Sequence, residues 1–194
     1  NFPPIISYRP AEQEILIENE EFIFKCKSFD MNINDRLFWA IDTLSMHGAT
    51  ISEAGEILWS STNFIDNIEY QILLSDSINT DIMKGTVYVN SVPKIISSPP
   101  EYIQLGDTLL YHVVATDKNK VAPFQNQKSN ILYYNILSAP ENLSINDTGL
   151  VSFIPNENNL GENFIHIIVS DSIANVNHDF NLIVNDVPSI TSVD

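Results

Sequence analysis

A repeated passage constrains the fold of this chain more than any single residue. Residues 162–188 alternate β-branched apolar and polar positions on either side of Ser170-Asp171-Ser172 and end in a Val-Pro pair. Residues 68–93 have the same order, with Ser75-Asp76-Ser77 at the turn and the same ending. Such alternation around a short polar turn predicts a β-hairpin, and proline cannot continue a strand ladder. Recurrence at this spacing indicates tandem copies of one folding unit.

The repeat divides the chain into two modules. We place them at residues 1–91 and 92–186, and we interpret residues 187–194 as the start of a third module or a linker. Each module has about seven short alternating segments separated by turns and no helical period, which is typical of a Greek-key sandwich. We therefore predict an all-β chain of two tandem sandwiches joined end to end. The connection at residues 89–93 contains a proline and no glycine, so it should be stiff.

The charge of the chain excludes some classes of partner. Its formal net charge is −16, from 9 basic and 25 acidic residues. A field of this sign repels nucleic acids and anionic membranes, so we exclude a nucleic-acid role. No apolar run is long enough to insert this segment into a membrane. Ca²⁺ is compatible with the charge, because carboxylate and amide oxygens are its ligands. A solvated acidic surface without metal is the alternative reading.

Several side chains are expected in the core of the first module. Alternation places Phe22, Phe24 and Cys26 on one face of a strand. Cys26, the single cysteine of the chain, is therefore predicted to be a buried apolar residue rather than a disulfide partner or a nucleophile. Trp39 lies within an apolar run and is predicted to be the central aromatic residue of this core.

Binding residues are expected at two places on the second module. The repeat is interrupted by extra residues at positions 121–128, which include Phe124. Exposed loops tolerate length changes and often carry contacts, so Phe124 is a candidate binding residue. Tyr102 is a second candidate, because an exposed aromatic ring can stack on a sugar or dock a protein. A change of length without any role is the other interpretation of the loop.

The order of several motifs resembles a known family. The motifs are Ala115-Thr116-Asp117-Lys118-Asn119, Tyr133-Tyr134-Asn135-Ile136, Thr148-Gly149 and the ending Val184-Asn185-Asp186-Val187-Pro188. Together they resemble the cadherin-like repeats of the dystroglycan type and the immunoglobulin-like repeats of bacterial surface proteins. The resemblance covers both modules. It implies two immunoglobulin- or cadherin-like sandwiches in an extracellular or cell-surface protein.

The cadherin resemblance also implies Ca²⁺ at the junction between repeats. Cadherin repeats bind it through an Asp-x-Asp loop, an Ala-x-Asp before the last hairpin, a linker and an Asp-Arg-Glu element. The positions of this chain that fall on or near these elements are Asp117, Asn119, Asp171, Asn90 and Asp66. Asn119 and Ser91 stand where the family has aspartate, so the expected site has fewer carboxylates. Alternatively, Asp76 and Asp171 cap the hairpin turns through backbone amides.

Several functions remain open from the sequence. We expect a structural or adhesive segment, a rigid stalk or fibre-forming module whose partners are neighbouring repeats or other copies of the chain. The alternative is a module that binds glycans or surface proteins, attached to a secreted enzyme or adhesin. We expect no catalytic activity, because His47, His112, His166 and His178 are scattered and no nucleophile motif is present.

Overall fold

The computed structural model describes residues 1–42, 46–119 and 131–186. These residues form two compact units. The first contains Asn1–Ser91 and also Asn119, and the second contains Val92–Lys118 and residues 131–186. The loop at 121–128 with Phe124 and the proposed third-module segment 187–194 lie outside the described residues. Within the described ranges, no helix has the length and apolar character needed to cross a bilayer.

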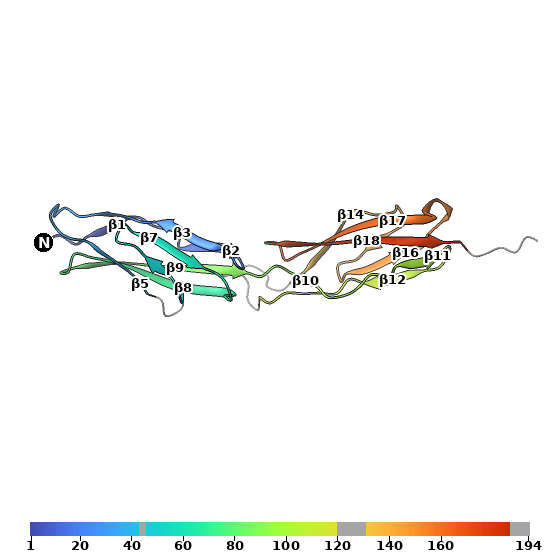
Figure 1. The fold of residues 1–194 in the computed structure, drawn as a ribbon, viewed down its shortest axis with the longest axis horizontal. Helices are drawn as coiled ribbons and strands as arrows, with labels where there is room; N and C mark the ends of the chain where they lie inside the picture. Colours follow the sequence, from blue (N-terminus) through green and yellow to red (C-terminus); the bar gives the residue numbers. More distant parts are fainter. Residues whose placement is uncertain (43–45, 120–130, 187–194) are drawn as a thin grey trace, which may run out of the picture. The chain divides into compact units, whose positions relative to one another are not determined.

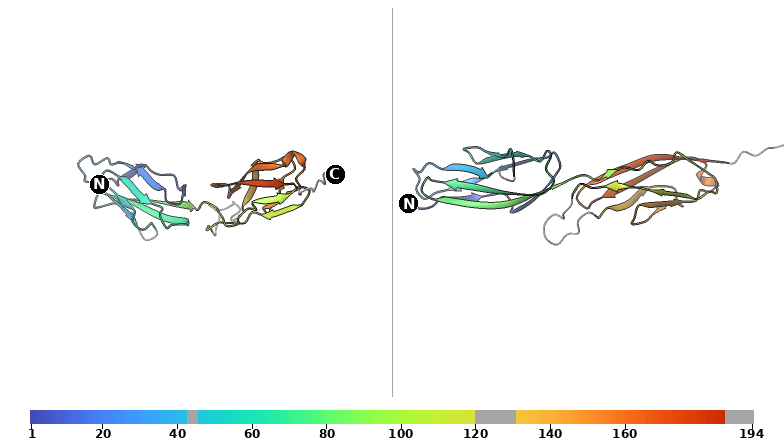
Figure 2. Two further views of the ribbon diagram at one scale, coloured as in Figure 1. Left: turned by 45° about the vertical axis from the view of Figure 1, so that its right-hand side comes forward. Right: turned by 90° about the horizontal axis from the view of Figure 1, so that it is seen from below.

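Two layers of strands make up the first unit (Figures 1 and 2). One sheet has the order β2 (Gln13–Ile17), β9 (Thr80–Asn90), β8 (Asp66–Ser75) and β5 (Phe38–Asp42), with β2 parallel to β9. In the other layer β3 (Glu21–Lys25) pairs with β7 (Glu56–Ser60), which pairs with β6 (Thr50–Ile51). The same layer is extended where β1 (Ile5–Tyr8) pairs with β4 (Lys27–Phe29).

The second unit repeats this topology. Its first sheet has the order β11 (Tyr102–Gln104), β18 (Asn175–Asn185), β17 (Gly161–Ser170) and β14 (Tyr133–Ser138), with β11 parallel to β18. Opposite it, β12 (Leu109–His112) pairs with β16 (Leu150–Phe153), which pairs with β15 (Ser144–Ile145), and β10 (Lys94–Ile95) pairs with β13 (Ala115–Thr116). A single 3₁₀ turn, η1 (Glu157–Asn159), precedes β17 among the described residues. The predicted all-β fold of two tandem sandwiches is confirmed.

Each unit is closed by one long hairpin, β8–β9 in the first and β17–β18 in the second (Figure 1). Both turns are built in the same way. The Oδ1 atom of Asp171 accepts hydrogen bonds from the amides of Ile173 and Ala174 at 2.7 Å. Ser172 adopts a positive φ of 80°, which the capping aspartate supports. Asp76 accepts the equivalent amides in the first unit, so the alternative turn-capping interpretation of the repeated Ser-Asp-Ser is confirmed.

The two cores are separate clusters of inward-facing side chains. Cys26 is buried as predicted, and burial raises the pKa of its thiol to about 11, which keeps it protonated near neutral pH. The prediction for Trp39 is wrong. The fully buried tryptophan is Trp59, which is 1% exposed and packs edge-on against Phe64.

Trp39 is only partly buried because its ring covers a glycine turn. A Cβ atom on Gly55 would lie 3.1 Å from the Trp39 ring, and Gly55 has a positive φ of 78°. The second unit repeats the arrangement with Tyr134 beside Gly149, whose φ is 84°. Glycine adopts this backbone conformation at no steric cost, and the missing side chain admits the aromatic ring. The aromatic residue on β5 or β14 therefore closes the edge of each core.

Tyr70 and Gly85 face each other across the hairpin of the first unit. The Tyr70 ring is buried, and a Cβ atom on Gly85 would overlap the ring. The Tyr70 hydroxyl donates a hydrogen bond to the carbonyl of Ala11 at 3.3 Å, which fixes the ring in this position. Gly85 is therefore required by packing, since its φ is not in the left-handed region.

The mutation Gly85→Ala should lower the free energy of unfolding of the first unit by about 1–3 kcal/mol, because the new methyl group overpacks against the Tyr70 ring. Denaturant unfolding followed by tryptophan fluorescence measures this unit selectively, since Trp39 and Trp59 are the only tryptophans of the chain. Lys84→Ala, at the exposed neighbouring position, is the control. Equal unfolding midpoints for the two variants would contradict the packing argument.

Candidate functional site

Asn119 is the centre of a buried polar cluster in the first unit. Its side chain is 4% exposed, and Ser91 and Asn90 are buried beside it. The Asn119 Oδ1 accepts hydrogen bonds from the Ser91 amide at 2.7 Å and from the Ser91 hydroxyl at 2.9 Å. Its Nδ2 donates to Asp66 Oδ1 at 3.0 Å and to the Val89 carbonyl at 2.9 Å. All hydrogen-bonding directions of the Asn119 amide are thus used.

Hydrogen bonds join the two positions at which the calcium motif departs from cadherin. Asn119 and Ser91 both stand where that family has aspartate, and here the hydroxyl of one donates to the amide oxygen of the other. Asp66 has an uncommon positive φ of 68°, and its carboxylate is held by Asn119. Asn90 donates from its own amide to the Ser91 carbonyl at 2.9 Å. The polar cluster is therefore satisfied without an ion at these atoms.

The remaining residues predicted for calcium lie in the second unit. Asp171 caps the β17–β18 turn and is half-buried. Asp117 follows β13 and is also half-buried. The structure brings Asn119, Asp66 and Asn90 together in the first unit and places Asp117 and Asp171 in the second. Calcium at the junction stays a prediction.

Three carboxylates missed by the sequence reasoning meet in the first unit. One ligand oxygen from each of Asp30, Asp35 and Asp76 lies within 4.8 Å of the others. Carboxylate oxygens at this spacing could hold a divalent cation. The sequence contained a signal for them, because Asp30 and Asp76 occupy the repeat positions of Asp117 and Asp171. Hydrogen bonds also explain two of them, since Asp30 caps the amide of Asn32 at 2.7 Å and Asp76 caps its turn.

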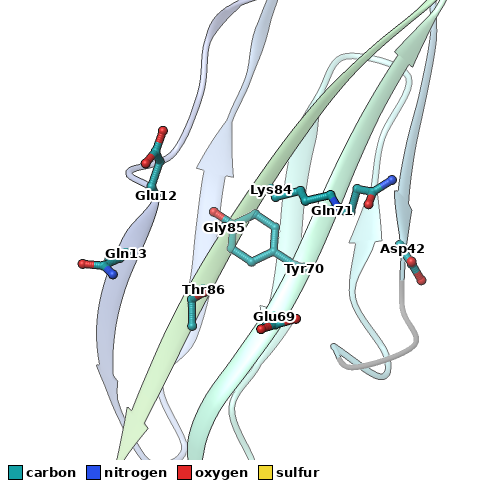
Figure 3. A pocket seen from close by; sticks show the side chains of 9 residues that line it. All are labelled: Glu12, Gln13, Asp42, Glu69, Tyr70, Gln71, Lys84, Gly85 and Thr86. Atoms are coloured by element: carbon teal, nitrogen blue, oxygen red, sulfur yellow. The ribbon is translucent and has the colours of Figure 1, made fainter. Parts of the chain in front are cut away.

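An open groove of about 450 Å³ lies over Gly85 on the first unit. Its lining residues are Glu12, Gln13, Asp42, Glu69, Tyr70, Gln71, Lys84, Gly85 and Thr86. Figure 3 shows the Tyr70 ring beside the Gly85 backbone, with Lys84 and Gln71 toward one end and Glu69 and Thr86 toward the other. Three carboxylates and one lysine make the groove acidic. Its chemistry favours a cationic ligand over an anionic one.

His178 is half-buried in the second unit and contacts polar and aromatic side chains. Its Nε2 lies 2.9 Å from the Tyr111 hydroxyl, which lies 2.9 Å from the Ser97 hydroxyl. The ring packs against Phe180 at a centroid distance of 5.1 Å. Burial lowers the pKa of His178, and the charge of Asp179 opposes part of that shift. Ser97 precedes β11, Tyr111 lies on β12 and His178 lies on β18, so these hydrogen bonds connect three segments of the second unit.

The other predicted binding residues are placed as follows. Tyr102 is 68% exposed on the edge strand β11, so its ring is accessible as expected. Phe124 lies outside the described residues. His112 is exposed, with its Nε2 2.6 Å from the carbonyl of Thr148, and His166 lies 3.6 Å from Asp179. The absence of catalytic activity stays a prediction.

Solved structures of tandem immunoglobulin-like domains resemble this chain. The I-band fragment I67-I69 from titin matches with a TM-score of 0.59 at 13% identity, over 96% of this chain and 67% of that chain. Sidekick-1 immunoglobulin domains 1-4 match with a TM-score of 0.61 at 12% identity, over 94% of this chain and 49% of that chain. Human Protocadherin-24 EC1-2 matches at 15% identity and a TM-score of 0.46, over 97% of this chain and 100% of that chain.

These comparisons establish the fold. At such low identity the titin and Sidekick-1 matches show that the two units are tandem immunoglobulin-like sandwiches. The chain spans about half of the Sidekick-1 fragment it matches. No family model matches the sequence, and no curated protein does either.

The mutation Asn119→Ala should lower the free energy of unfolding of the first unit by about 1–3 kcal/mol, because the Ser91 amide and hydroxyl then lose a buried acceptor. Urea unfolding followed by tryptophan fluorescence is the measurement. Asn67→Ala, at an exposed position beside Asp66, is the control and should change little.

Asn119→Asp separates hydrogen bonding from calcium binding at the same position. The new carboxylate lies against Asp66 and should destabilise the unit by repulsion. A millimolar addition of Ca²⁺ should restore much of that loss, since binding to the folded state alone adds stability. If Asn119→Asp unfolds at the wild-type midpoint without Ca²⁺, the hydrogen-bond account of the cluster is wrong.

Acidification should destabilise the second unit through His178. Its pKa is lowered by folding, so the neutral form is the one that fits the core. The contribution of His178 to the free energy of unfolding is therefore fully present above pH 6.5, the ordinary pKa of histidine. It is lost as the pH falls toward the lowered pKa of the folded state, because the unfolded chain takes up the proton first. Calorimetric melting between pH 7.5 and 5 should show this loss in the transition of the second unit. That transition does not change tryptophan fluorescence, because both tryptophans lie in the first unit. His178→Gln should remove the pH-dependent part, and an unchanged slope in that variant would exclude His178 as its source.

Proposed function

We propose that this chain is a structural or adhesive segment of an extracellular or cell-surface protein, in which repeated sandwiches act as a stalk. The single observation that carries the proposal is the repetition of one complete sandwich, with its own core, its own long hairpin and its own Ser-Asp-Ser turn. Such units fold independently, so they can be added in series without new chemistry. The likeness to tandem immunoglobulin-like domains supports the same interpretation.

The connection between the modules supports a stalk, because residues 89–93 contain a proline and no glycine. Ser91 ends the first unit, and Asn119 comes from a later part of the chain, after β13. Asn119 is hydrogen-bonded to Ser91, to Asp66 and to the Val89 carbonyl at the end of β9. A short connection that contains a proline and no glycine is stiffer than a glycine-rich linker. We infer that neighbouring repeats, and other copies of the chain in a fibre, are the partners of this segment.

Catalysis forms no part of this proposal. The two described grooves offer carboxylates, amides and one lysine, and neither is lined by a serine–histidine or cysteine–histidine pair. Calcium at the junction remains part of the proposal as an additional stiffening ligand.

Small-angle X-ray scattering of the whole chain tests the stalk. We expect a scattering profile of two sandwiches held apart, with a maximum dimension close to the sum of two module lengths. The profile should change little between low and 0.5 M salt, because the stiffness of a short connection with a proline and no glycine does not depend on charge. A compact pair folded back on itself, or a dimension that varies strongly with salt, would count against a stiff stalk. Sedimentation of the same samples measures association between copies.

A further inference from the structure

A second groove, on the second unit, has the chemistry of a sugar-binding site. It has a volume of about 440 Å³, within the range typical of small-ligand sites, and lies between the end of β14 and the start of β17. Its lining includes Asn142, Asn156, Asn158, Asn159, Asn163 and Phe164. Three short segments within residues 138–164 therefore supply one concave surface rich in amides.

The backbone holds these amides in place while leaving part of each available. The Oδ1 atoms of Asn156 and Asn159 accept hydrogen bonds from the amides of Asn158 and Asn156, both at 2.9 Å. Asn163 Nδ2 donates to the carbonyls of Asn159 and Gly161 at 2.7 and 3.1 Å. Within the described structure, Asn156 Nδ2, Asn159 Nδ2 and Asn163 Oδ1 take no part in hydrogen bonds. The groove thus presents oriented donors and an acceptor whose positions are already fixed.

An exposed aromatic ring completes the groove. Phe164 is 53% exposed on β17, although it is a large apolar side chain. The neighbouring His166 ring lies at a centroid distance of 6.4 Å, with the two ring planes at 64° to each other. An aromatic face next to fixed amides can take the apolar C–H face of a pyranose ring while the amides bond its hydroxyls.

The composition of the groove excludes other ligand classes. None of the described lining residues is a lysine, arginine or histidine, and Glu141 adds a negative charge to an already acidic chain, so an anionic ligand is disfavoured. One carboxylate is too few for a calcium cage. Uncharged hydroxyl groups match both the amides and the carboxylate. We propose that this groove binds a neutral saccharide unit, which adds a glycan-binding activity to the structural role.

The first unit lacks this combination at the same ladder positions. Counted from the hairpin turn, Ile68 and Glu69 of β8 occupy the places of Asn163 and Phe164 of β17. Ile68 packs against the core and Glu69 is exposed and charged. The amides and the aromatic ring are therefore a property of the second unit and not of the shared sandwich.

Affinity electrophoresis of the whole chain in native gels tests the proposal. The net charge of −16 drives migration, and the gels contain a neutral polysaccharide (galactomannan, laminarin, mannan or hydroxyethyl cellulose) or the anionic alginate. Bacterial expression keeps Asn142, which begins an Asn-Leu-Ser sequon, unmodified. We expect retardation by at least one neutral polysaccharide and none by alginate.

Two variants locate the binding. Phe164→Ala and Asn158→Ala should each weaken retardation by roughly tenfold, since one removes the stacking face and the other an amide that makes no hydrogen bond within the described structure. The matched control is Tyr133→Ala, because Tyr133 is 46% exposed on the same sheet but does not line the groove. Equal melting temperatures show that all variants fold. Retardation by none of the neutral polysaccharides, or retardation unchanged by Phe164→Ala, overturns the proposal and leaves the structural role untouched.

Discussion

The pairing of β8 with β9 and of β17 with β18 is the interaction on which each sandwich depends. Both ladders continue in unbroken register over their whole length. Because side chains alternate across a strand, this register fixes which residues enter the core, among them Ile72 and Leu74 in the first unit. The turn aspartates hold the register at its closed end by accepting two backbone amides each. A slip of one residue would turn both core faces toward solvent.

Local patterns predicted most of this architecture. The hairpins, the two modules and the burial of Cys26 follow from alternation and turn chemistry, which act over a few residues. How deeply an aromatic side chain is buried does not follow from such local patterns. Trp39 and Trp59 both lie in apolar strands, but a glycine turn from another part of the chain draws Trp39 to the edge of the core. Only the tertiary approach of Gly55 decides between them.

The candidate sites were harder to predict, because each depends on how separate segments meet in the fold. The resemblance to cadherin repeats identified Asn119 and Asp66 as neighbours, yet the direct bond between Asn119 and Ser91 depends on atoms that a motif does not specify. Asp30 and Asp76 could have been found by applying the same motif to the first module. For the groove beside Phe164, the only signal in the sequence was a cluster of asparagines. The sequence does not show that three segments come together to form its walls.

The two units also show how a repeated sandwich can diverge without losing its core. Tyr70 faces Gly85 across the first hairpin, whereas Ile165 faces Phe180 at the same place in the second. The large ring has moved from one strand to the other, so the volume between the sheets stays filled. The outer surfaces are not bound by this constraint. The first unit is hollowed over Gly85 and acidic, while the second is hollowed beside β17 and lined by amides. Differences in binding between such repeats therefore arise on the outer faces, where a changed side chain does not have to be compensated by its ladder partner.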